Sequence, residues 1–131
     1  MKLLKSLGVM VLFFTMHTLS AQSLSEKWPA IKEFHGVMST TFHPAEEGNL
    51  EPIKTRSLEM VEKANALDVA TMPKEFSNDK IKDAVARLQK GAKELHQLVT
   101  EKVKDEVLVE KLTSLHDVFH EIVGLCKNEN H

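Results

Sequence analysis

The stretch LTSLHDVFHEIVGLC, residues 112–126, places an apolar residue at every third or fourth position. This spacing returns side chains to one face of an α-helix, whereas a half-buried strand would alternate apolar and polar residues. The full stripe begins one turn earlier and comprises Leu108, Leu112, Leu115, Phe119, Ile122 and Cys126. We therefore predict an amphipathic helix that begins at about Asp105 and turns this stripe toward a core.

Three more stripes of the same period precede this helix, separated by the proline-containing segment 44–52 and by Pro73. The first comprises Trp28, Ile31, His35, Met38 and Phe42, and it predicts that His35 faces inward. The second comprises Leu50, Ile53, Ser57, Met60, Ala64 and Leu67, and the third comprises Ile81, Val85, Leu88, Ala92, Leu95 and Val99. Helices of similar length with short connections predict an all-α fold, an antiparallel up-down-up-down four-helix bundle over residues 22–131.

The first 21 residues have the pattern of a secretory signal. Lys2 and Lys5 precede an apolar run over residues 7–16, which is too short to span a bilayer, and Ala21 offers a small residue for cleavage. We expect cleavage after residue 21, a periplasmic or secreted mature protein, and no stable membrane insertion after cleavage. The alternative is an uncleaved membrane anchor.

Charge and cysteine content argue against nucleic-acid binding and against nucleophilic catalysis. Taking Lys2 and Lys5 from the 17 basic residues leaves 15 against 19 acidic ones, a net charge of −4. A mildly acidic domain without a basic stripe argues against a nucleic-acid partner. Cys126 is the only cysteine, so no internal disulfide forms, and no serine or cysteine stands in an activating context. We expect a protein that is not an enzyme.

Histidines are the chemically distinctive residues of the mature chain. His116 and His120 are four residues apart, which places both imidazoles on one helix face at a spacing suited to metal chelation. In an antiparallel bundle His35 falls at about their level on the first helix, and His43 lies near two glutamates in HPAEEGN. His35, His43, His116 and His120 therefore form a candidate zinc or copper site. The alternative is a solvated histidine pair on a structural or partner-binding bundle.

The final helix also resembles that of the cytochrome c′ family. In LTSLHDVFH, residues 112–120, His116 falls on the histidine and Phe119 on the aromatic residue of that family's Cys-x-x-Cys-His-x-x-aromatic-Arg motif. Upstream, IKEFHGVM (residues 31–38) is similar to the family's Ile-Lys-x-Arg-Gln-x-x-Met segment. The related soluble periplasmic cytochrome b binds haem through a first-helix methionine and a last-helix histidine. The resemblance thus implies that His116 is the proximal haem ligand and that Met38 or His35 is the distal one. Phe42 and Phe119 would then line the haem pocket.

Departures from the family limit what the resemblance implies. Leu112 and Leu115 replace the two thioether cysteines, which excludes covalent haem attachment, and His120 replaces the arginine. The implied function is electron transfer or haem handling with a non-covalent haem b, a redox partner protein and a possible homodimer. The alternative is a bundle that binds or senses zinc or copper through its histidine cluster, or one that holds no cofactor. The sequence leaves these alternatives open.

Overall fold

The computed structural model describes residues 23–129, so the predicted signal peptide, residues 1–21, lies outside the described residues. The elements are α1 (Leu24–Lys27), α2 (Pro29–Glu46), α3 (Glu51–Asn65), the 3-10 turn η1 (Lys74–Phe76), α4 (Asp79–Thr100) and α5 (Asp105–Asn128). Every regular element in this range is helical, which confirms the predicted all-α class. The described residues form five α-helices rather than four, because a short first helix precedes α2. None of the described helices is long and apolar enough to cross a membrane.

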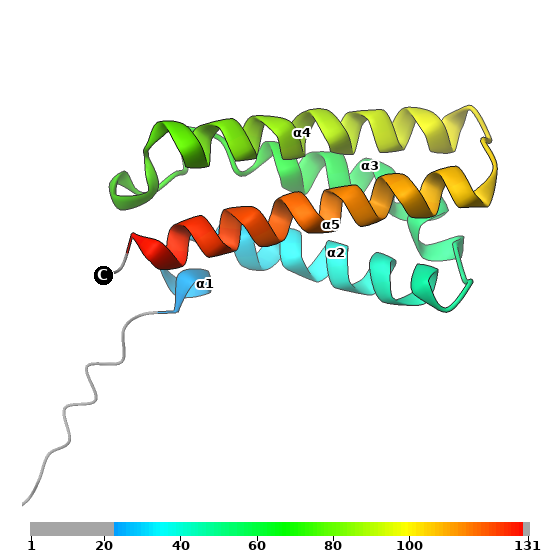
Figure 1. The fold of residues 1–131 in the computed structure, drawn as a ribbon, viewed down its shortest axis with the longest axis horizontal. Coiled ribbons are helices and arrows are strands. Elements are labelled where there is room, and N and C mark those ends of the chain that lie inside the picture. Colours follow the sequence, from blue (N-terminus) through cyan, green and yellow to red (C-terminus); the bar gives the residue numbers. More distant parts are fainter. Residues whose placement is uncertain (1–22, 130–131) are drawn as a thin grey trace, which may run out of the picture.

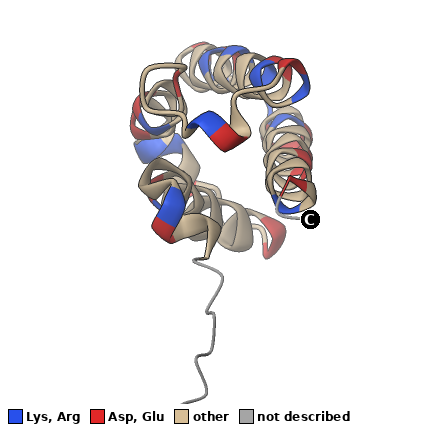
Figure 2. Ribbon diagram, turned by 90° about the vertical axis from the view of Figure 1, so that its left-hand side faces the viewer, with Lys and Arg blue, Asp and Glu red and all other residues tan. Residues whose placement is uncertain are grey.

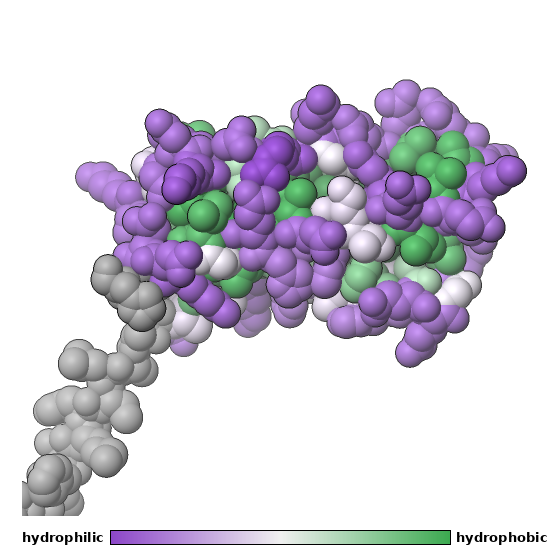
Figure 3. All heavy atoms as spheres, viewed as in Figure 1, coloured by the Kyte–Doolittle hydropathy of each residue, from purple (hydrophilic) through white to green (hydrophobic). Residues whose placement is uncertain are grey.

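The long helices α2, α3, α4 and α5 lie side by side along one axis (Figure 1). Helix α3 packs against α2 and α4, and α5 packs against α4 and, with a less extensive backbone approach, against α2. Acidic and basic residues are interspersed over the helices (Figure 2). Polar residues likewise cover most of the face drawn in Figure 3, with apolar patches between them. The seam between α2 and α5 is the one that carries the candidate histidines.

All four predicted stripes contribute to the core, and three of them do so with the residues that were predicted, apart from half-buried Val99. All six predicted stripe residues of α5 are buried, as are those of the second stripe and those of the third except half-buried Val99. A Cβ atom added at Gly91 would lie 2.7 Å from Cδ2 of Leu115, so the missing side chain admits this leucine between α4 and α5. The buried residues of the helices form one continuous core.

The predicted inward orientation of His35 is wrong. Phe34 is fully buried and His35 is exposed, and the inner face of α2 comprises Ile31, Phe34, Val37, Met38, Thr41, Phe42 and Ala45. Residues 34 and 35 both lie three or four positions from Ile31 and Met38, so the period admits either one. Burial of a phenyl ring is favourable by about 2 kcal/mol, whereas an imidazole would need a hydrogen-bond partner inside, and Phe34 therefore faces inward.

The first helix is also divided differently from its prediction. Ser23 caps α1 by accepting a hydrogen bond from the backbone N–H of Glu26 (3.3 Å), and the chain then bends at Trp28 before α2 begins at Pro29. The indole of Trp28 is buried and stacks on Phe76 of η1, with ring centroids 6.1 Å apart. At its other end α2 continues through Pro44 to Glu46, past the predicted break, and Gly48 then turns the chain with φ +91°.

The turn between α4 and α5 contains a strained residue. Lys102 adopts φ +55°, a left-handed conformation that is usually assigned to glycine at a helix C-terminus. Its backbone N–H bonds the carbonyl of Val99 (3.1 Å), and that of Val103 bonds the carbonyl of Leu98 (3.3 Å). These bonds close α4 and hold the side chain of Lys102 beside the start of α5.

We predict that Lys102→Gly raises the free energy of unfolding by about 0.5–1 kcal/mol. Relief of the left-handed strain is worth about 1–2 kcal/mol, and the added freedom of glycine in the unfolded chain offsets about half of it. Urea unfolding measures the difference. Lys93→Gly, at an exposed position inside α4, is the control and should lower stability by about 1 kcal/mol. An equal loss in both variants would contradict the assignment of strain to Lys102.

Candidate functional site

The seam between α2 and α5 brings together what we call the histidine face, which comprises His35, His43, His116 and His120. Two helices supply these residues, with His35 and His43 on α2 and His116 and His120 on α5. Because the inner stripes of both helices are filled by larger apolar residues, the histidines occupy the flanks of the stripes. His35, His43 and His120 are exposed, and His116 is half-buried.

His116 and His120 form a close imidazole pair. Their Nε2 atoms are 3.1 Å apart, and their rings meet edge to face with centroids 4.4 Å apart at 74°. One helical turn separates the two residues, which sets this proximity. Two neutral imidazoles satisfy the contact when one Nε2 donates its proton and the other accepts it. The pair therefore holds two nitrogen atoms at ligand spacing at the surface of α5.

Phenylalanine rings lie against the histidine rings. Phe42 stacks on His116 with centroids 3.9 Å apart and ring planes 11° from parallel. Phe119 stacks on His35 across the seam at 5.9 Å, and it also contacts Phe34 at 5.1 Å. Phe42 and Phe119 are themselves buried. The two aromatic residues that were predicted to wall a haem thus belong to the core and orient the imidazoles.

His35 and His120 share a shallow groove between α1, α2 and α5. Its volume is about 360 Å³, and Phe119 lines it together with Ile31 and Val123. The structure therefore brings His35 to the same groove as His120, as the shared level in the bundle predicted, although His35 reaches it from the exposed side of α2.

His43 lies near the other end of the seam. Its Nδ1 atom is 3.4 Å from a carboxylate oxygen of Glu46, and both side chains are well exposed. Glu46 raises and His43 lowers the pKa of His116, so both side chains lie near that imidazole. His43 and Glu46 are thus positioned on the α2 side of His116.

The pKa of His116 is lowered from its ordinary value of 6.5. Partial burial is the largest cause, because it disfavours the charged ring, and the neighbouring His120 adds to it. Asp117 and Glu46 act in the opposite direction. A lowered pKa leaves His116 neutral at pH 7, and a neutral imidazole is the form that binds metal ions.

Met38 and His116 do not fit a haem held between them in this arrangement. The side chain of Met38 is 1% exposed and lies in the packed core. The Nε2 atom of His116 contacts exposed His120, and Phe42 covers one face of the His116 ring. A haem at this seam would require α2 and α5 to separate.

A histidine–serine pair and a buried thiol lie away from the histidine face. His96 on α4 is half-buried and its Nδ1 atom is 2.8 Å from the hydroxyl of buried Ser57 on α3. This pair was not predicted from the sequence. The only signal for it was a serine on the otherwise apolar stripe of α3, because a buried hydroxyl needs a hydrogen-bond partner. Burial raises the pKa of the Cys126 thiol to about 12, which makes it a poor thiolate ligand.

Within residues 23–129, no three histidine, cysteine, aspartate or glutamate side chains are gathered as a complete metal site. The histidine face thus presents a pair of nitrogens with additional polar groups around it. In comparisons with known proteins, no family model, curated protein or solved structure matches the chain. The resemblance to cytochromes consequently depends on the two sequence motifs alone.

We predict that stability depends on pH through His116. Its native pKa is below the unfolded value of 6.5, so His116 favours the native state above pH 6.5, and this contribution is lost as pH falls through the native pKa. Urea unfolding between pH 5 and pH 8 measures the effect. His116→Gln should show a shallower loss of stability on acidification than the unmodified chain. Identical pH dependences of stability in the two proteins would contradict a lowered pKa of His116.

Proposed function

We propose that the histidine face binds a single transition-metal ion, zinc or copper, in a periplasmic or secreted protein built as an antiparallel up-down-up-down bundle. The observation that carries this proposal is the 3.1 Å separation of the Nε2 atoms of His116 and His120. It supports metal binding because a tetrahedral zinc ion, with bonds of 2.0–2.1 Å, holds two ligand nitrogens roughly 3.3 Å apart. A small side-chain rotation would convert the imidazole contact into a chelate.

Side chains from α2 are available to complete the coordination. Glu46 and His43 stand on one side of His116, and His35 shares the groove with His120. Imidazole and carboxylate ligands suit zinc and copper(II). Recruiting any one of these α2 groups would bring the site to three protein ligands, with water as the fourth. His35, His43 and Glu46 are all exposed, so a change of rotamer at any of them would not open the core.

The surroundings favour binding or sensing over catalysis. Phe42 and Phe119 occupy the space beneath the imidazoles, and the only cysteine is buried at the far end of the α5 stripe. The described residues therefore place no thiol beside the histidine face. The proposed protein takes up an ion at its surface without reshaping its core.

We predict that zinc and copper(II) bind at one site at pH 7.5, and that His120→Ala weakens binding more than about 100-fold. Losing an outer-shell partner of a metal site already costs 10–100-fold, and His120 would be a direct ligand. Isothermal titration calorimetry measures both affinities. His96→Gln is the matched control, because it removes an imidazole from the α3–α4 seam while retaining a group that can bond Ser57. Equal affinity in His120→Ala and the control would sink the proposal.

The haem function implied by the cytochrome resemblance gives a different result with the same variants. Non-covalent haem on His116 predicts a Soret band in protein purified from cells supplied with haem. The band should weaken in His116→Ala and largely survive in His120→Ala. Absence of a Soret band, together with saturable zinc binding, would exclude the haem function and support the metal proposal. A bundle without a cofactor predicts neither signal.

A further inference from the structure

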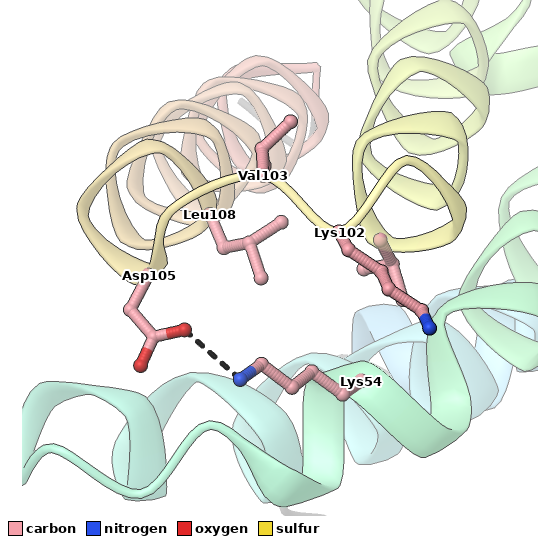
Figure 4. A pocket seen from close by; sticks show the side chains of 6 residues that line it. Lys54, Lys102, Val103, Asp105 and Leu108 are labelled. Carbon is pink, nitrogen blue, oxygen red and sulfur yellow. Dashed lines mark ion pairs between the residues drawn. The ribbon is translucent and has the colours of Figure 1, made fainter.

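A second cavity lies at the opposite end of α5 from its C-terminus, where α4 turns into α5 over α3. Its volume is about 520 Å³, within the 300–1,000 Å³ of small-molecule sites. Three apolar side chains line it, Val99, Val103 and Leu108, and three charged ones, Lys54, Lys102 and Asp105. In Figure 4, Leu108 points into the space between Lys54 and the turn. Leu108 is the lining residue nearest to the histidine pair along α5, and His116 lies about two turns, roughly 12 Å, beyond it, so the cavity is separate from the histidine face.

Three charged side chains line the cavity, two lysines and one aspartate, and Glu51 on α3 also acts on the charge of Lys54. Lys54 pairs with Asp105 at 2.9 Å, and this hydrogen bond is the largest cause of the raised pKa of Lys54. Lys102 extends from the turn toward α3 (Figure 4), and it has no ion-pair partner within residues 23–129. The charge of Lys54 is therefore compensated by Asp105. The uncompensated charge is that of Lys102.

Backbone strain marks the same residue. Lys102 is the only residue other than glycine with positive φ in the described chain, residues 23–129. Glycine would adopt this conformation without strain, yet the position carries a long cationic side chain at the mouth of a cavity. Backbone strain and a charge without an ion-pair partner among the described residues thus occur together at Lys102, beside the apolar lining of the cavity. Apolar patches also reach the surface at this end of the molecule (Figure 3).

We propose that this cavity binds a small monocarboxylate with an apolar body, such as a medium-chain fatty acid. The carboxylate pairs with the ammonium group of Lys102, and the hydrocarbon contacts half-buried Val99 and Val103 next to Leu108, which is itself 1% exposed. A single negative charge matches the single uncompensated positive charge, whereas a dianion would compete with Asp105 for Lys54. An inorganic anion would leave the apolar wall uncovered, and a neutral lipid would leave Lys102 without a partner.

Octanoate is the probe for the test, with octan-1-ol and inorganic phosphate as controls that lack the charge and the apolar body. Calorimetry on the purified protein should give one octanoate site with a Kd of roughly 0.1 mM, and at least about tenfold weaker binding of both controls. Methyl NMR shifts should report contact at Val99, Val103 and Leu108. Lys102→Gly and Lys102→Gln should weaken octanoate binding at least about fivefold.

The variants separate loss of binding from loss of folding. Lys102→Gly relieves the backbone strain, so weaker binding by this variant cannot result from unfolding. Lys93→Gln removes an exposed charge elsewhere on α4 and should leave octanoate affinity unchanged. The proposal is overturned by absence of saturable octanoate binding, by methyl shifts confined to other residues, by unchanged affinity in Lys102→Gly, or by phosphate binding as tightly as octanoate.

Discussion

The closure of four apolar stripes into one core is the constraint on which the rest of this structure depends. Each long helix contributes residues at a spacing of three and four, and the largest of these side chains are almost completely buried. An interior packed in this way has no room for a charged or hydrated group. Chemically active side chains must therefore occupy the flanks of the stripes or the ends of the helices, and both candidate sites lie in such places.

Phe42 and Phe119 connect the core to the histidine face. Each buries one side in the bundle and presents its ring to an imidazole, Phe42 to His116 and Phe119 to His35. This arrangement restricts how far the histidines can turn, because core packing holds the phenyl rings in place. The same packing partly buries the His116 ring and so lowers its pKa, which leaves the imidazole neutral at pH 7. A feature of packing thereby prepares ligand chemistry at the surface.

The sequence predicted most of the core correctly because the stripes of α3, α4 and α5 each admit one set of apolar residues. On α2 two sets satisfy the same period, one through Phe34 and one through His35, and the sequence prediction took the wrong one. Ring burial and the cost of an unpartnered imidazole decide between them, and both depend on three-dimensional contacts. The pairing of His116 with His120 was predictable from helix geometry alone. The cavity beside Lys102 was not, since it joins a residue of α3 to a turn that is distant in the sequence.

Of the seams between neighbouring long helices, that between α2 and α5 has the least extensive backbone approach. The two helices are also far apart in the sequence, so no short turn holds them together as it does for α4 and α5. An ion bound by His116 and His120 of α5 and by one group of α2 would cross-link this seam. Such an ion would bind the closed bundle more tightly than the separated helices, because one ligand comes from α2, and this difference in binding free energy would add to the stability of the fold. Metal binding and closure of the bundle would then be linked through the seam where packing alone contributes least.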